Sequence, residues 1–148
     1  MDTSNESDLS PFYAPHQNYG ANMQAQEITK ENIRILIMTF YAKIIKDDIV
    51  GPFFIAKLGD DMSNERWVTH LEIIIGFWSS LAFGKPKYNG NLFLPHTKLG
   101  TLKRETFEQW LKLFAETLDE VYVDDIAKRF KERSTLIARN FMQNLMIT

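Results

Sequence analysis

The chain has 148 residues, enough for one domain that buries its own hydrophobic core without disulfides or a structural metal. Charged residues make up 24% of the chain and the formal net charge is −2, so the overall charge gives no reason to bind nucleic acid. Cysteine is absent, which excludes disulfides, thiolate metal sites and iron–sulfur clusters.

The first 25 residues are rich in Ser, Asn, Gln, Pro and Ala and show no sustained apolar period, which is typical of a flexible tail. We therefore predict a tail at residues 1–25, in which His16 is solvated, and a folded domain at residues 26–148. The acidic N-terminus does not resemble a secretory signal, and no apolar run reaches the length of a membrane span. We expect a cytoplasmic protein that does not associate with membranes.

A first helix is predicted after Thr29, which is a suitable N-cap. Apolar residues recur at helical spacing through the run 33–45. Tyr41 lies within this apolar stripe and allows two interpretations. It is either a core tyrosine bonded to a backbone carbonyl or a donor that points into a ligand pocket, and spacing alone favours the core residue.

Gly51-Pro52 should break the chain, which places Phe53 and Phe54 in a loop. Two aromatic residues in a loop either pack against the core below the loop or pack against a flat aromatic cofactor.

The next helix is predicted to begin at Ser63 as its N-cap. One apolar face of it comprises Trp67, His70, Leu71, Ile74, Ile75 and Trp78. His70 is either a core histidine or a polar group aimed into an apolar pocket, which Ile74, one turn further on, would also line. Gly76 costs about 1 kcal/mol relative to Ala in a helix interior, which predicts a close neighbour at that point.

A short connector then carries His96 between Pro95 and Gly100. Pro95 could start a short helical turn at its first position. A histidine on a connector between two apolar helices suits a single axial ligand that faces a hydrophobic slot, although composition alone favours a surface histidine.

Two further helices are predicted, one from Arg104 and one capped by Asp124-Asp125. Trp110 lies on the apolar face of the first, where its indole N–H needs a partner if it is buried. With four main helices and few strands, the chain belongs to the all-α class.

Several enzyme classes are excluded because the chain has no Gly-rich phosphate loop, no His-Glu-x-x-His and no Gly-x-Ser-x-Gly motif. Four polar-tipped side chains remain at otherwise apolar positions, namely Tyr41, His70, His96 and Trp110. Packing explains each of them alone. A helix bundle that placed all four around one slot would form a haem pocket, with one histidine on the iron and the others facing a bound ligand.

An ordered set of motifs over about residues 30–147 resembles the truncated haemoglobins, specifically their third group. The motifs are Phe40-Tyr41, Gly51-Pro-Phe-Phe54, Trp67-x-x-His70, Gly76-Phe-Trp78, Tyr88-Asn-Gly90, His96 and Gln109-Trp-Leu-Lys-Leu-Phe114. Groups one and two carry glycine pairs beside their helices, and this chain has none.

The resemblance implies a globin-like two-over-two helical sandwich with a haem pocket, in which the proximal helix is shortened to a loop around His96. His96 would be the proximal ligand of the iron, and the haem would be haem b, because no Cys-x-x-Cys-His motif is present. The remaining haem contacts would come from Phe54, Ile74 and Trp78. On the distal side, Tyr41 and Trp110 would donate hydrogen bonds to the gas ligand, and His70 would act as a gate.

The expected ligands at a five-coordinate iron are dioxygen, nitric oxide or other diatomic molecules, and peroxide. Two donors would slow oxygen release, which favours redox or detoxification chemistry over bulk oxygen transport. Nitric oxide dioxygenase or peroxidase-like activity would require an external reductase, since the chain has no flavin or nicotinamide domain. The alternative is a cofactor-free helical protein-interaction module.

Overall fold

The computed structural model describes residues 24–84 and 102–145, which form five helices and no strand. In chain order the helices are α1 (Lys30–Ile44), α2 (Gly51–Leu58), α3 (Glu65–Phe83), α5 (Arg104–Val121) and α6 (Asp124–Asn144). The all-α class is confirmed, but the prediction of four main helices missed one.

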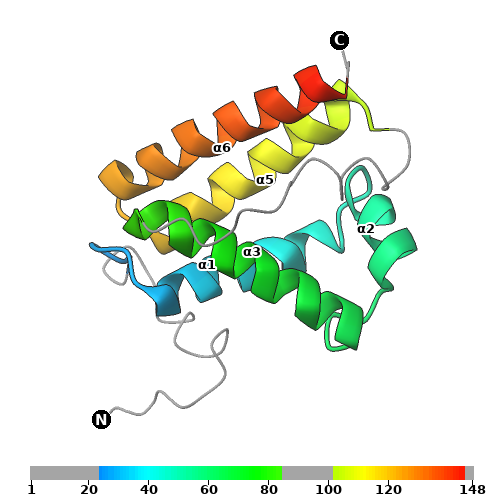
Figure 1. Cartoon of the computed structure of the whole chain (residues 1–148), viewed down its shortest axis with the longest axis horizontal. Coiled ribbons are helices and arrows are strands. Elements are labelled where there is room, and N and C mark those ends of the chain that lie inside the picture. The colour runs from blue at the N-terminus through cyan, green and yellow to red at the C-terminus, as the bar shows by residue number, and fades with distance from the viewer. Residues whose placement is uncertain (1–23, 85–101, 146–148) are drawn as a thin grey trace.

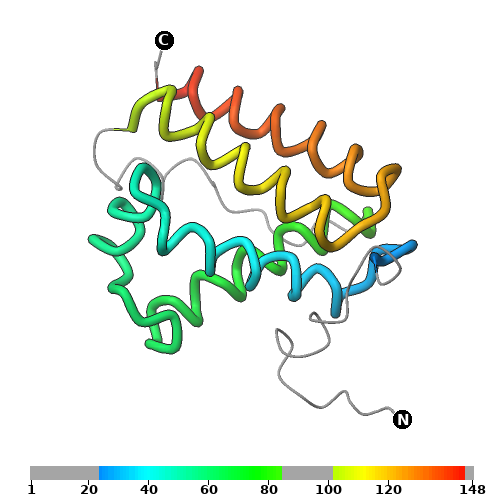
Figure 2. The backbone as a smooth tube through the Cα atoms, turned by 180° about the vertical axis from the view of Figure 1, so that it is seen from behind, coloured from blue at the N-terminus to red at the C-terminus, as the bar shows by residue number. Residues whose placement is uncertain are grey.

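The helices lie in two layers. In Figure 1, α5 and α6 run side by side across the upper layer, α1 and α3 cross beneath them, and α2 lies at one end. The view from behind shows the same arrangement (Figure 2). Helix α1 packs against both α3 and α5, and α5 packs against α6. The predicted two-over-two sandwich is thereby confirmed.

Helix α1 begins where the sequence predicts. The Thr29 hydroxyl accepts a hydrogen bond from the Asn32 N–H at 3.1 Å, and the Asn32 side chain accepts one from the Thr29 N–H at 2.9 Å. This reciprocal capping satisfies two of the N–H groups that a helix start leaves without a partner. Ile33, Ile37 and Tyr41 then point into the core at helical spacing.

Helix α2 corrects the prediction that Phe53 and Phe54 lie in a loop. Pro52 occupies the first turn of α2, where a helix tolerates proline because the missing N–H has no partner there. A Cβ on Gly51 would lie 2.8 Å from the Ile44 carbonyl oxygen, so glycine allows α2 to start directly against the end of α1. Gly51-Pro52 therefore mark a helix start.

Helix α3 corrects two further predictions. Its N-cap is Asn64 instead of Ser63, and the Asn64 side chain accepts from the Trp67 N–H at 2.9 Å. The Ser63 hydroxyl donates to Asp61 at 2.6 Å in the preceding turn. Gly76 is exposed, and an added Cβ there would meet no atom of residues 24–84 and 102–145 within 4 Å. The predicted close neighbour is therefore absent from the part of the chain that the structure describes.

Helix α6 begins one residue earlier than predicted, because its N-cap is Val123. Asp124 and Asp125 occupy the first turn, where their charge complements the helix dipole.

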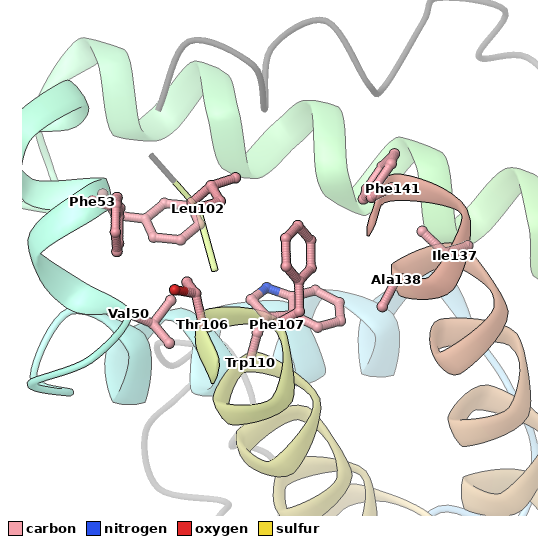
Figure 3. A pocket seen from close by; sticks show the side chains of 10 residues that line it. Val50, Phe53, Leu102, Thr106, Phe107, Trp110, Ile137, Ala138 and Phe141 are labelled. Carbon is pink, nitrogen blue, oxygen red and sulfur yellow. The ribbon is translucent and has the colours of Figure 1, made fainter. Parts of the chain in front are cut away.

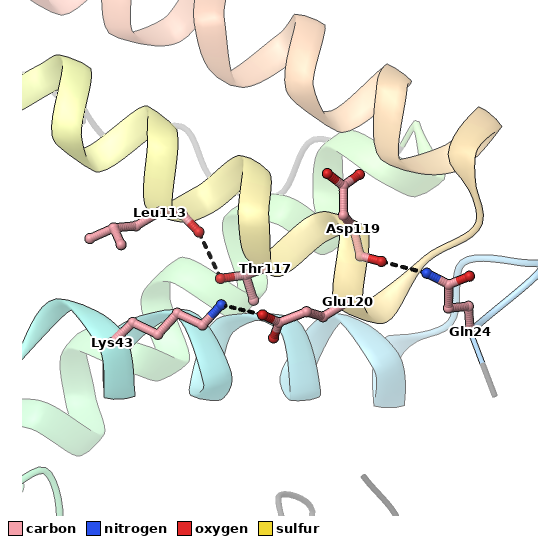
Figure 4. Close-up of polar contacts among 6 residues, drawn as sticks. All are labelled: Gln24, Lys43, Leu113, Thr117, Asp119 and Glu120. Carbon is pink, nitrogen blue, oxygen red and sulfur yellow. Dashed lines mark hydrogen bonds and ion pairs between the residues drawn. The ribbon is translucent and has the colours of Figure 1, made fainter. Parts of the chain in front are cut away.

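Polar contacts hold α1 and the strand-like residue Ala25 to the end of α5. Lys43 pairs with Glu120 at 2.7 Å, and Gln24 donates to the Asp119 carbonyl (Figure 4). The Ala25 N–H donates to the Val121 carbonyl at 2.8 Å. Within the same helix, the Thr117 hydroxyl donates to the Leu113 carbonyl at 2.8 Å. Residues 24 and 25, the end of the predicted tail, are thus bound to the domain.

The rest of the predicted tail, with His16, lies outside the described residues. In the described ranges, no helix has both the length and the apolar character needed to cross a bilayer.

Candidate functional site

An apolar pocket opens between α2, α5 and α6 (Figure 3). Its empty volume is about 480 Å³, including the open side. The lining consists of Val50, Phe53, Phe54, Leu102, Thr106, Phe107, Trp110, Ile137, Ala138 and Phe141. The threonine hydroxyl and the indole N–H are the only polar side-chain groups among these residues, so the pocket favours a mostly apolar ligand.

Tyr41 lies beside this pocket in a cluster of aromatic rings. Only 3% of the residue is exposed. Its ring meets Phe54 edge-on at 5.5 Å between centroids, His70 at 5.2 Å and Trp67 at 5.8 Å. Trp67 is itself held by the hydrogen bond that its indole N–H donates to the Gly59 carbonyl at 2.8 Å. The position of the tyrosine ring is therefore fixed on several sides.

Burial raises the pKa of the Tyr41 hydroxyl, and the indole N–H of Trp110, which acts on the same oxygen, opposes that shift. A tyrosine hydroxyl is protonated at physiological pH even at its usual pKa, and the raised pKa extends this range, so the Tyr41 hydroxyl can donate a hydrogen bond.

Trp110 forms part of the pocket wall and brings a second donor to the same side. It stacks on Phe114 with ring centroids 5.2 Å apart and meets Phe40 edge-on at 5.3 Å. The structure thus brings two neutral donors together. Trp110 lines the pocket, whereas Tyr41, like His70, does not line it and lies against Phe54 of the pocket wall. Tyr41 is thus a core residue, as one of the two interpretations predicts, and its role as a donor to a ligand stays a prediction.

His70 lies next to Tyr41 and Phe54 on α3, with its Nε2 atom buried. Ile74, one turn further along α3, is half-buried against the core. Trp78 is buried between Phe114 and Phe130, at centroid distances of 5.3 and 5.5 Å. Neither Ile74 nor Trp78 lines the pocket between α2, α5 and α6.

His96 lies outside the described residues. Within residues 24–84 and 102–145, no group of three His, Asp or Glu side chains could hold a metal ion.

Part of the pocket was missed by sequence reasoning. Phe107, Ile137 and Phe141 lie at helical spacing on the apolar faces of their helices, and this spacing does not distinguish a pocket wall from a packed core. Val50, Thr106 and Ala138 carry no signal of their own in the sequence. The pocket arises where three helix ends diverge, and only the packing of those helices reveals it.

One carboxylate joins two walls of the pocket. One oxygen of Asp47 accepts from the N–H groups of Ile49 and Val50 at 2.9 and 2.8 Å, and the other accepts from the Gln109 side chain at 2.7 Å. Burial acts to raise the pKa of this carboxyl, but these hydrogen bonds and the charge of Lys112 outweigh it, so the pKa lies below its usual range.

Comparisons with known proteins were made for both sequence and structure. No model of a protein family matches the chain. Over 124 residues the chain is 36% identical to a group 3 truncated haemoglobin of Campylobacter jejuni, which covers 84% of this chain and 95% of that protein. The fold matches the crystal structure of a group III truncated haemoglobin from the same species with a TM-score of 0.76. That match covers 83% of this chain and 95% of the other, again at 36% identity.

Proposed function

The chain belongs to the group III truncated haemoglobins, and on this premise we propose that it binds haem b in the apolar pocket between α2, α5 and α6 and takes up a diatomic gas there. The observation that carries the proposal is the meeting of two neutral donors, Trp110 in the wall of the pocket and Tyr41 next to Trp110, beside a lining that is otherwise apolar except for Thr106.

The residues present fit such a group. A haem ring is flat and largely apolar, and aromatic side chains face the pocket from two sides, Phe53 and Phe54 on α2 and Phe107 on α5. With no cysteine in the chain, the haem would be held non-covalently, which agrees with the b type.

When bound, haem would supply an iron atom with one coordination position open to a gas molecule. On the family resemblance, His96 would be the residue that holds the iron. Tyr41 and Trp110 would each donate a hydrogen bond to the gas, and His70, packed against Tyr41, would control access to it. Ile74 and Trp78 would support the distal side from within the core, since both lie on α3 with His70.

Oxygen delivery requires rapid release, whereas two donors in a desolvated pocket retain the gas. We therefore favour chemistry on dioxygen, nitric oxide or peroxide over bulk oxygen transport. Such turnover needs electrons, and a separate reductase would have to supply them.

The decisive experiment is a haem titration followed by ultraviolet–visible spectroscopy. The wild type should develop a sharp Soret band at a 1:1 ratio, and His96→Ala should lose or markedly alter it. His16→Ala is the matched control, because this histidine lies in the predicted tail, and its spectrum should equal that of the wild type. A band that His96→Ala leaves unchanged would move the axial ligand to another residue, His70 first. A wild type without any band would favour the cofactor-free interaction module.

A further inference from the structure

We propose that Asp47 is a positioning residue for the apolar pocket between α2, α5 and α6. Its carboxylate links the start of α2 to the turn of α5 that carries Trp110. The proposal rests on the proposed function, because its purpose is to hold the Trp110 donor in place. Asp47 itself lies in the turn between α1 and α2 and does not line the pocket.

On the α2 side, Asp47 takes the role of a helix cap. Val50, the N-cap of α2, makes no capping hydrogen bond with its own side chain. Instead, one carboxylate oxygen of Asp47 accepts from the N–H groups of Ile49 and Val50, and the Asp47 carbonyl accepts from the Gly51 N–H at 2.9 Å. These three bonds satisfy N–H groups at the helix start and orient α2, whose Phe54 touches Tyr41.

On the α5 side, the second carboxylate oxygen accepts from the Gln109 amide at 2.7 Å, across 62 positions of the chain. Gln109 directly precedes Trp110, and Thr106 in the same turn also lines the pocket. A bond that holds Gln109 restricts rotation of this turn about the helix axis, and therefore restricts the direction of the indole N–H.

A simple role in holding α1 to α5 does not explain this arrangement. The Lys43–Glu120 pair already joins the two helices at 2.7 Å (Figure 4). Glu120 is in the last turn of α5, far along the helix from the pocket residues of its first two turns. Asp47 differs from this pair because each of the three partners of its carboxylate is a residue of the pocket wall or directly precedes one in the chain.

The test uses Gln109→Met, which removes only the bond across the pocket, and Glu120→Gln, which weakens the other link between α1 and α5 as the matched control. Two readouts on the haem-loaded protein with carbon monoxide report the donor itself. These are the carbon monoxide stretching band in the infrared and the indole N–H resonances in a proton–nitrogen NMR spectrum.

We expect Gln109→Met to broaden or split the carbon monoxide band and to shift the Trp110 indole resonance. The Trp67 indole, which is bonded to Gly59, should stay in place as an internal reference. Oxygen release should accelerate about two- to tenfold, the equivalent of one ordinary hydrogen bond. Glu120→Gln should match the wild type in all three measurements.

The aspartate is tested by its own conservative variant. Asp47→Ala should reproduce the effect of Gln109→Met. Asp47→Asn should restore most of the wild-type spectrum, because the amide oxygen can still accept from Val50 and the amide group can pair with a reoriented Gln109.

If Gln109→Met and Asp47→Ala give the same carbon monoxide band and indole resonance as Glu120→Gln, the positioning role is wrong. A wild type that forms no carbon monoxide complex would instead refute the proposed function. In that case the indole N–H spectrum of the purified protein still decides whether Asp47 and Gln109 hold Trp110. A shifted Trp110 resonance in Gln109→Met supports the positioning role, and an unchanged resonance overturns it.

Discussion

Removal of one oxygen atom from Tyr41 tests the distal site most directly, and the chain contains its own control. Tyr41 and Tyr122 are both buried tyrosines whose pKa is raised by burial. The Tyr122 hydroxyl donates to the Asn32 side chain at 2.7 Å, at the start of α1 and away from the pocket. Tyr41→Phe and Tyr122→Phe are therefore the same chemical change at a functional and at a structural position.

The magnitudes follow from the contacts. Phenylalanine keeps the ring contacts of Tyr41 with Phe54, Trp67 and His70, so only the hydroxyl is lost. A hydrogen bond to a charged or strongly polarised acceptor is worth about 1.5–3 kcal/mol, which corresponds to roughly a ten- to hundredfold faster release of oxygen. Tyr122→Phe should cost about 0.5–1.5 kcal/mol of unfolding free energy and leave oxygen release unchanged.

Oxygen release would be measured by stopped flow with carbon monoxide as the competing ligand, and stability by urea unfolding. If Tyr41→Phe released oxygen at the wild-type rate, Tyr41 would not be a distal donor. If Tyr122→Phe accelerated release as much as Tyr41→Phe, the effect would reflect general loosening of the fold, and the reasoning from the pocket geometry would fail.

Three further predictions follow from the same geometry. Trp110→Phe should accelerate oxygen release about tenfold, as measured by the same stopped-flow assay, because it removes the second donor. Ala138→Phe should fill the pocket and weaken haem uptake in a titration, while the exposed Leu136→Phe on the same helix should not; equal uptake by both variants would place the haem elsewhere. The pKa of Asp47 is depressed in the folded state, so its ionised carboxylate increases the free energy of unfolding. This stabilisation is complete above the usual carboxyl pKa and is lost as the pH falls through the depressed pKa. The difference in unfolding free energy between the wild type and Asp47→Asn should therefore shrink as the pH falls from about 5 to below 3 in urea titrations, and a difference that stays constant would contradict it.

The sequence alone was sufficient for the helices whose signals are local. The Thr29 cap and the apolar period of α1 depend on residues three and four apart, and the structure has both. The same holds for the face of α3 that buries Trp67, Leu71 and Trp78. The family could also be predicted, because residue types at fixed intervals suffice for a resemblance.

Local reasoning failed where a residue type permits two backbone conformations. Gly51-Pro52 suits a chain break and a helix start equally well, and the choice depends on the contact of Gly51 with the end of α1. Gly76 suggested a close neighbour that the described residues do not provide, since glycine is also tolerated on an exposed helix face at a modest cost.

Only the tertiary structure decided which candidate side chains meet. Tyr41 and Trp110 are far apart in the chain and come together because α1 packs against α5. The same packing brings Gln109 to Asp47, a contact that no spacing in the sequence indicates. Helical periodicity determines which face of each helix is buried, but the crossing of the helices determines what that face touches, and the pocket with its two donors is a product of the crossing.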